Sequence, residues 1–164
     1  MDFSLLLGSV LALCSPSSAM PSTLNHKNVI LFDGVCNFCN RWVNFVIDND
    51  PNQIFKFAAM QSQAGQSILK QHNRDPNDLS TFVLIDQHGS LYTQSDAALH
   101  VAKTLQQPAI SSLAQVGTAV PKPLRDGLYR LIADNRYSIL GKDTTGNLES
   151  CKLRAPNELG RFLG

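Results

Sequence analysis

The sequence predicts an α/β fold in which strands and helices follow the order βαβαββα, with a helical extension and an irregular tail after this core. Two observations lead to this prediction. Short apolar runs rich in β-branched and aromatic residues alternate with segments of helical periodicity, and the links between them are short. The chain has 164 residues, of which 43% are hydrophobic, and this length suits one domain with its own core. We therefore expect a single domain over residues 27–164.

The first strand and the first helix are predicted between residues 28 and 50. Residues 28–32, NVILF, form a continuous apolar run of the kind found in strands buried on both faces, and Asp33-Gly34 ends it. Apolar side chains then recur with the period of a helix, at Phe38, Trp42, Phe45 and Val46. Asp50-Pro51 breaks this helix.

A second strand and a second helix follow at once. Residues 54–57 have strand composition, and Met60, Ala64 and Ile68 then mark a helix that runs to about His72. Because a strand, a helix and a strand are joined here by short links, we expect a right-handed βαβ unit.

A hairpin and a third helix complete the predicted core. Residues 81–85 and 91–93 have strand composition, and Gln87-His88-Gly89 between them suits a tight turn. Ser95 is predicted to be the N-cap of the next helix. Its apolar side carries Ala98, Val101, Ala102 and Leu105.

The extension contains two further helices. A weak one is predicted from Ile110, and a stronger one follows Pro121 and Pro123. The stronger helix has four apolar residues in phase, Leu124, Leu128, Leu131 and Ile132. Gly141 is expected to close it, and residues 142–164 to lie over the domain as coil.

The charge of the chain argues against two classes of partner. Lys and Arg total 14 and Asp and Glu 13, a net charge of +1, and the cations are scattered rather than gathered on one face. This is not the pattern of a nucleic-acid-binding surface. No stretch has the roughly 18 consecutive apolar residues that span a bilayer. We expect a monomer that binds no nucleic acid and does not span a membrane.

Residues 1–19 allow two interpretations. An apolar run over residues 3–14 is followed by small residues, as in a cleaved targeting segment, although no Lys or Arg precedes Lys27. Alternatively, Met20 is the true start of the protein. The first interpretation predicts an exported or organellar protein, and the second a cytoplasmic one. In both, residues 1–19 stand outside the fold.

The sequence Cys36-Asn37-Phe38-Cys39 carries the candidate chemistry. This C-x-x-C follows the first strand and begins a helix, where unpaired N–H groups and the helix dipole favour a thiolate. We predict that Cys36 is the nucleophile, with its pKa lowered towards neutral pH. Cys39 lies one turn deeper, and we expect it to be buried as a thiol until it attacks a mixed disulfide at Cys36.

Asp33 precedes Cys36 by three residues at the end of the first strand. One role for its carboxylate is to accept the backbone N–H of Val35 or Cys36 in a turn. The other is proton transfer to or from Cys39 during disulfide exchange, which requires burial.

The same cysteines allow other interpretations. Two cysteines at this spacing can be half of a zinc site, completed by Cys151 and one histidine among His26, His72, His88 and His100. No second C-x-x-C or paired histidines accompany them. A non-catalytic metal-binding module and an interaction domain of the same fold therefore stand as alternatives to redox chemistry.

Gln94 and Ser95 form a candidate substrate-binding site. They stand between the fourth strand and the next helix, and a helix start offers N–H groups to an anion. Glutathione transferases and glutaredoxins, whose folds share this order of elements, hold the glutamyl end of glutathione with a similar Glu or Gln followed by Ser. Simple helix capping is the alternative role.

Residues 29–39, VILFDGVCNFC, resemble the thiol-disulfide oxidoreductase family called DCC, named for the residues that stand here as Asp33, Cys36 and Cys39. The likeness extends to residue 162. Further matching residues are Ser95-Asp96-Ala97-Ala98, Leu124-Arg125-Asp126, Tyr129, Asn135-Arg136-Tyr137, Gly141, Cys151 and Arg161-Phe162. The resemblance implies a thioredoxin-like fold and a dithiol that acts on protein or small-molecule thiols and disulfides, without a bound cofactor.

Two departures affect the substrate. Gln94 stands where a basic residue often precedes the serine in this family, which weakens the case for a charged substrate group there. Thioredoxins place a cis-proline before the third strand, facing the C-x-x-C, and Leu79-Ser80-Thr81 occupies that stretch here. We therefore do not expect peptide docking of the thioredoxin type.

Cys151 stands in the irregular tail, more than a hundred residues after the C-x-x-C. It either packs as a small apolar residue or serves as an alternative resolving thiol for Cys36. The second role requires Cα atoms within about 7 Å of each other.

Overall fold

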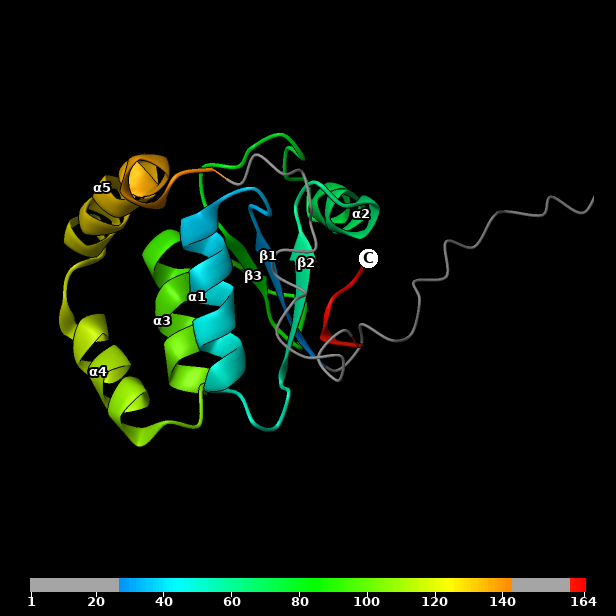
Figure 1. Cartoon of the computed structure of the whole chain (residues 1–164). Helices are drawn as coiled ribbons and strands as arrows, with labels where there is room; N and C mark the ends of the chain where they lie inside the picture. Colours follow the sequence, from blue (N-terminus) through cyan, green and yellow to red (C-terminus); the bar gives the residue numbers. More distant parts are fainter. Residues whose placement is uncertain (1–26, 143–159) are drawn as a thin grey trace, which may run out of the picture.

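A computed structural model describes residues 27–142 and 160–164 of the chain (Figure 1). The predictions on residues 1–19 and on Cys151 lie outside this range. The elements follow the order β1 (Asn28–Phe32), α1 (Asn37–Asp48), β2 (Phe55–Ala59), α2 (Gln63–Gln71), β3 (Val83–Ile85), β4 (Leu91–Thr93), α3 (Gln94–Thr104), α4 (Pro108–Ala119) and α5 (Lys122–Leu140). The predicted βαβαββα order and the two later helices are confirmed.

The strands form a mixed sheet in the order β2-β1-β3-β4. β1 pairs in parallel with β2, with Asn28 opposite Phe55, and antiparallel with β3, where Ile30 lies opposite Leu84. β3 and β4 form the antiparallel hairpin, with Leu84 opposite Tyr92. This mixed α/β arrangement is consistent with a thioredoxin-like fold.

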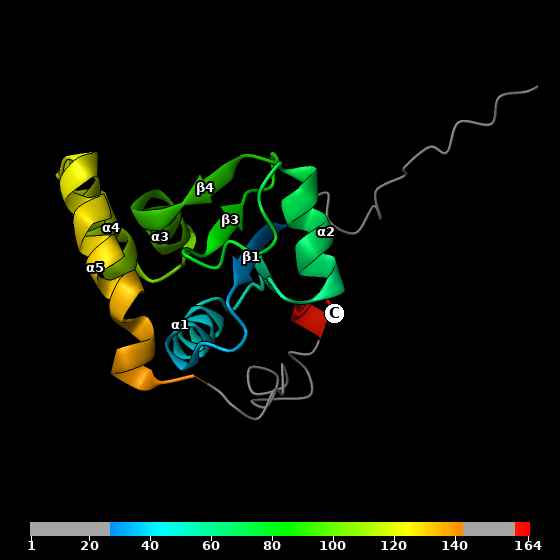
Figure 2. The same cartoon turned by 90° about the horizontal axis from the view of Figure 1, so that it is seen from above.

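Helices cover both faces of the sheet, which explains the uninterrupted apolar run of β1. Ile30 and Phe32 point to one face and pack with residues of α1 and α3. Val29 and Leu31 point to the other face and pack with residues of α2. All five residues of β1 are buried. Figures 1 and 2 show α1 and α3 on one side of the sheet and α2 on the other.

Helices α4 and α5 form an outer layer over α3 and α1 (Figures 1 and 2). The apolar residues predicted to share one side of α5 do so, but that side faces solvent: Leu124, Leu128 and Leu131 are 68%, 61% and 63% exposed. The buried face of α5 contains Asp126, Ala133 and Arg136. The polar side of α5 therefore faces the core, and it supplies charged groups to the interior. No helix within the described ranges is long and apolar enough to cross a membrane.

The start of α3 differs from the prediction. Its N-cap is Thr93, without a side-chain hydrogen bond, so the assignment of Ser95 as N-cap is wrong. The reason is that the Ser95 hydroxyl is turned to α5, where it donates to the carboxylate of Asp126. Gly141 ends α5 as predicted, with a φ of 75° that favours glycine.

The last residues of the chain return to β2. The backbone N–H of Leu163 donates to the carbonyl of Phe57 at 2.8 Å, and Phe162 pairs with Phe57 in an isolated parallel bridge. The guanidinium of Arg161 binds the carboxylate of Asp50, and both residues are 2% exposed. A buried ion pair therefore fixes this end of the chain to the loop before β2.

The buried pair gives a first testable prediction. Replacing Arg161 with Ala leaves the Asp50 carboxylate buried without its cation, so we expect the free energy of unfolding to fall by about 3 kcal/mol. Urea unfolding measures it. The control is Arg74→Ala, which removes a partly exposed ion pair with Asp78, and we expect a loss under about 1 kcal/mol there. Equal losses in the two variants would contradict a structural role for the Arg161 pair.

Candidate active site

The two cysteines meet at the first turn of α1. Cys36 is the N-cap residue of this helix, and its sulfur accepts the backbone N–H of Cys39 at 3.4 Å. Both cysteines are free thiols. The short link between β1 and α1 thus brings the helix start, with its unpaired N–H groups, directly to the Cys36 sulfur.

The two thiols differ strongly in acidity. A hydrogen bond from the Cys39 thiol lowers the pKa of Cys36 from 9.0 to about 6, against the opposing effect of burial. The same hydrogen bond, together with burial, raises the pKa of Cys39 well above its usual range. At neutral pH the pair therefore holds one thiolate, on Cys36, and one thiol, on Cys39. The sequence argument predicts this direction from the helix dipole, but the larger cause is the shared proton.

The exposure of the two sulfurs does not follow the prediction. Cys36 has no exposed surface, whereas Cys39 is only partly buried. The chain just after α5 lies against the first residues of the motif: Cys36 forms an isolated bridge with Lys142, and the side-chain amide of Asn37 donates to the carbonyl of Leu140 at 3.2 Å. Cys36, the predicted nucleophile, is therefore the better covered of the two cysteines.

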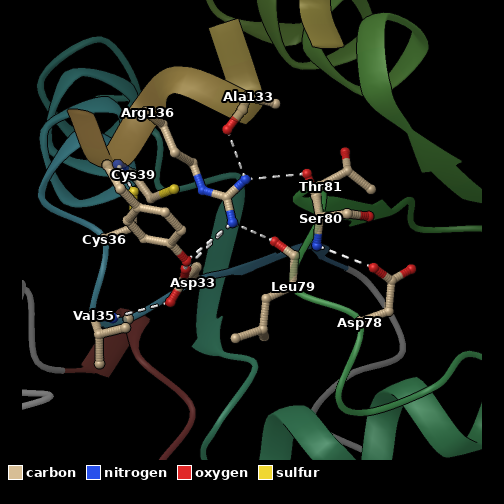
Figure 3. Close-up of polar contacts among 12 residues, drawn as sticks. Asp33, Val35, Cys36, Cys39, Asp78, Leu79, Ser80, Thr81, Ala133 and Arg136 are labelled. Carbon is tan, nitrogen blue, oxygen red and sulfur yellow. Dashed lines mark hydrogen bonds and ion pairs between the residues drawn. The ribbon is translucent and has the colours of Figure 1, made fainter. Parts of the chain in front are cut away.

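Asp33 is buried at the end of β1, with 3% of its surface exposed. One carboxylate oxygen accepts the backbone N–H of Val35 at 3.2 Å and the side-chain amide of Gln61 at 2.7 Å. The other accepts the Tyr137 hydroxyl and lies 3.6 Å from the guanidinium of Arg136 (Figure 3). Asp33 thus makes the predicted turn and also takes part in a buried charged cluster.

Arg136 supplies the cation of this cluster. Its terminal nitrogens donate to the backbone carbonyls of Leu79 at 2.7 Å, Ser80 at 3.3 Å and Ala133 at 2.9 Å, and to the Tyr137 hydroxyl at 3.0 Å (Figure 3). It is 9% exposed. The side chain therefore ties α5 to the segment before β3, beside the dithiol.

Tyr137 completes the cluster. Its ring lies under two cations, with the Arg136 guanidinium 4.5 Å and the Lys142 ammonium 4.4 Å from the ring centre. Burial and the neighbouring Asp33 carboxylate raise the pKa of Tyr137 to about 12. Its hydroxyl therefore stays protonated and donates to Asp33. Sequence reasoning did not assign a site role to Arg136 or Tyr137, although both belong to the motif through which the chain resembles the DCC family.

The segment Leu79-Ser80-Thr81, for which the sequence predicts no cis-proline of the thioredoxin type, precedes β3. The structure contains no cis peptide bond within residues 27–142 and 160–164. Instead, Arg136 holds the carbonyls of Leu79 and Ser80, and the Thr81 hydroxyl contacts that of Tyr129 at 2.8 Å. A buried arginine and a tyrosine from α5 therefore position this segment.

A cavity of about 190 Å³ opens beside Cys39, between α1, α3, α5 and the segment before β3. Its walls are mostly apolar. The lining residues are Phe32, Asp33, Phe38, Cys39, Trp42, Leu79, Ser80, Thr81, Phe82, Ala98, Tyr129, Ile132, Ala133 and Arg136. Cys39, Asp33 and Arg136 therefore border a common cavity, whereas Cys36 and Tyr137 do not line it.

The predicted substrate-binding pair Gln94-Ser95 lies elsewhere. Neither residue lines the cavity. The Ser95 hydroxyl donates to Asp126, its backbone N–H lies 3.4 Å from the same carboxylate oxygen, and the backbone N–H of Gln94 donates to the Thr81 hydroxyl at 3.1 Å. An internal carboxylate thus occupies the helix start that an anionic substrate group would need. Substrate binding by Gln94 and Ser95 stays a prediction.

The described residues contain no group of three or more His, Cys, Asp or Glu side chains placed to hold one metal ion. Two of the residues proposed for a zinc site, His26 and Cys151, lie outside the described ranges. The other three histidines, His72, His88 and His100, do not line the cavity beside Cys39.

A sheet of this topology with a C-x-x-C at the start of its first helix is typical of the thiol-disulfide oxidoreductase class. Comparison with known proteins agrees: the DCC1-like thiol-disulfide oxidoreductase family matches residues 30–142. The chain belongs to this family. Its redox function is therefore supported in general terms, and the expected resemblance is confirmed.

Two curated relatives cover most of the chain. The uncharacterized protein YuxK of Bacillus subtilis is 42% identical over 137 residues, which are 84% of this chain and 94% of that protein. The chloroplastic DCC family protein At1g52590 of Arabidopsis thaliana is 40% identical over 127 residues, 77% of this chain and 70% of that protein. No solved structure gives a significant match.

The shared proton gives a second prediction. Replacing Cys39 with Ala removes the thiol that donates to Cys36, so the pKa of Cys36 should rise from about 6 towards 9.0. The pH dependence of alkylation by iodoacetamide measures it, since only the thiolate reacts. In the reduced wild-type protein Cys36 should react much faster than Cys39 near pH 7. An unchanged midpoint in Cys39→Ala would exclude the shared proton as the main cause.

Proposed function

We propose that this protein is a thiol-disulfide oxidoreductase that cycles Cys36 and Cys39 between dithiol and disulfide, without a bound cofactor. The observation that carries the proposal is the hydrogen-bonded thiol pair at the start of α1, in which one shared proton separates the two pKa values. A reactive thiolate beside a protonated thiol is the arrangement that two-step disulfide exchange requires.

The reaction balances with the dithiol as the only reductant. The Cys36 thiolate attacks one sulfur of a substrate disulfide, a mixed disulfide forms, and the first substrate thiolate leaves and takes up a proton. Cys39 then loses its proton and attacks the Cys36 sulfur. The intramolecular disulfide forms, the second substrate thiol is released, and two electrons have passed from the dithiol to the substrate. The reverse sequence oxidises a dithiol substrate.

In this mechanism Asp33 accepts the Cys39 proton. The carboxylate is buried, lines the same cavity as Cys39, and is held by Tyr137, Gln61 and the backbone of Val35. These contacts fix its orientation, and the Arg136 guanidinium balances its charge. Proton transfer by a positioned side chain typically contributes about 10²–10⁴-fold to a rate.

Access to Cys36 requires a local movement. Because Cys36 has no exposed surface, the segment from Leu140 to Lys142 has to separate from it before a substrate disulfide arrives. This segment contacts the motif through the backbone bridge between Lys142 and Cys36 and through the hydrogen bond from the Asn37 side chain to the Leu140 carbonyl.

Trapping tests the proposal. With dithiothreitol as reductant and a protein disulfide as substrate, Cys36→Ser should reduce activity to background, and Cys39→Ser should accumulate a mixed disulfide, because the second step is blocked. Mass spectrometry identifies the trapped thiol. Cys151→Ser is the matched control and should keep wild-type activity. An internal disulfide in Cys39→Ser would instead make Cys151 a second resolving thiol.

Metal analysis of the purified protein tests the alternative. One zinc per chain that is lost in Cys36→Ser would reject the redox assignment in favour of a metal-binding module.

The role of Asp33 is tested by Asp33→Asn, which keeps the shape of the side chain and removes its charge. We expect release of substrate from the mixed disulfide to slow by at least about tenfold. Alkylation of Cys36 should not slow, because the Asp33 charge adds to burial in raising the pKa of Cys36. Rapid-mixing kinetics separate the two steps.

The control for this variant is Asp86→Asn, which alters a buried aspartate in the turn between β3 and β4. It should change neither rate. Equal slowing of both steps in Asp33→Asn would indicate a general structural effect rather than proton transfer.

A further inference from the structure

We propose that the cavity beside Cys39 is a substrate subsite that receives one apolar side chain attached close to the reacting sulfur. The substrate class is then a thiol or disulfide with a neighbouring aromatic or large aliphatic group, such as a peptide cysteine beside phenylalanine. This inference rests on the proposed redox function and names the substrates that the same site prefers.

The size of the cavity limits what it can hold. At about 190 Å³ it is slightly larger than a 150 Å³ apolar protein cavity that binds benzene, and smaller than the roughly 300–1,000 Å³ of pockets that enclose a whole ligand. It therefore has room for one side chain of about the size of a phenyl ring. The rest of the substrate has to remain outside.

The lining favours an apolar occupant. Aromatic rings form much of the wall, and the ring centres of Trp42 and Phe82 lie 4.3 Å apart. Two of the polar lining groups already have partners within the protein: the Thr81 hydroxyl contacts Tyr129 and the backbone of Gln94, and both oxygens of Asp33 accept hydrogen bonds. The amino and carboxylate groups of a substrate such as glutathione would find few complementary groups here.

One donor in the wall is free, and it suits a sulfur. Nε of Arg136 is buried and has no hydrogen-bond partner among the residues that the structure describes. In Figure 3 this nitrogen is on the side of the guanidinium that faces the cysteines, whereas the terminal nitrogens are directed to Asp33, Leu79 and Ala133. A thiolate formed at Cys39 or on the leaving group can accept this hydrogen bond. The site therefore combines an apolar chamber with a donor for sulfur.

The position of the cavity connects the subsite with the second step. Phe38 and Cys39 come from α1, Ile132 and Ala133 from α5, and Leu79 and Phe82 from the segment before β3. Cys36 does not line the cavity, so an apolar group held there lies beside Cys39, the thiol that attacks the mixed disulfide in the second step. Substrates that fill the cavity should then be released faster as well as bound more tightly.

Binding can be measured without redox chemistry. Trp42 is the only tryptophan in the sequence and lines the cavity, so its emission reports an occupant. In a Cys36→Ser, Cys39→Ser double variant, we expect a capped Phe-Cys peptide with its sulfur methylated to change the emission saturably. S-methylglutathione should cause no change at the same concentrations. Equal responses to the two probes would overturn the inference.

Two variants on this background test the location. Ala98 lines the cavity from α3, and Ala98→Leu fills it, so affinity for the Phe-Cys peptide should fall at least about tenfold. Ala102→Leu, one turn later on α3 and outside the cavity, is the matched control and should bind as before. Ile132 is 41% exposed, so Ile132→Asn is tolerated and should also weaken binding. Unchanged affinity in both cavity variants would place the peptide elsewhere.

Kinetics separate this inference from the proposed function. The wild-type protein should reduce the disulfide dimer of the Phe-Cys peptide at least about tenfold faster than glutathione disulfide. Equal rates with the two disulfides would leave the redox function intact and overturn the subsite. If the protein reduced neither disulfide but still bound the peptide, the redox function would be overturned. The bound peptide would then no longer be assigned as a substrate.

Discussion

The contact between Asp33 at the end of β1 and the Arg136-Tyr137 pair of α5 is the constraint on which the site depends. It places a carboxylate, a guanidinium and a phenol in the interior, each with partners that compensate for its burial. It also fixes three separate parts of the molecule together: the turn before Cys36, helix α5, and the segment before β3. Residues from all three parts line the cavity.

The hydrogen bond between the two cysteines is a second, more local constraint on the site. Cys36 and Cys39 share one proton, so their acidities are properties of the pair rather than of either residue. The helix start sets the geometry in which this sharing occurs, since the Cys39 N–H and the Cys39 thiol both approach the same sulfur. Oxidation to the disulfide abolishes the thiolate altogether, whereas the buried Arg136 guanidinium keeps Asp33, Tyr137 and three backbone carbonyls as partners.

Much of this was accessible from the sequence, because the informative signals are local. The β1 run, the position of the C-x-x-C and the turn at Asp33 all depend on neighbours within a few residues. The contribution of α5 was not accessible. The apolar stripe of a surface helix ordinarily faces the core. Leu124, Leu128 and Leu131 nevertheless face solvent, because Asp126 and Arg136 on the opposite side form long-range polar contacts. Periodicity identifies a helix, but it does not predict which side of the helix faces the core when that side forms polar contacts with residues distant in the sequence.

The separation of Asp33 and Tyr137 by 104 residues has a consequence for how the protein is made. At about 5–20 residues per second, a ribosome takes about 5–20 s to synthesise the chain between them. During that interval the strand, the turn and both cysteines are present while their arginine and tyrosine partners are not. The two cysteines can share their proton as soon as α1 forms, but the charged cluster beside them is complete only when α5 docks.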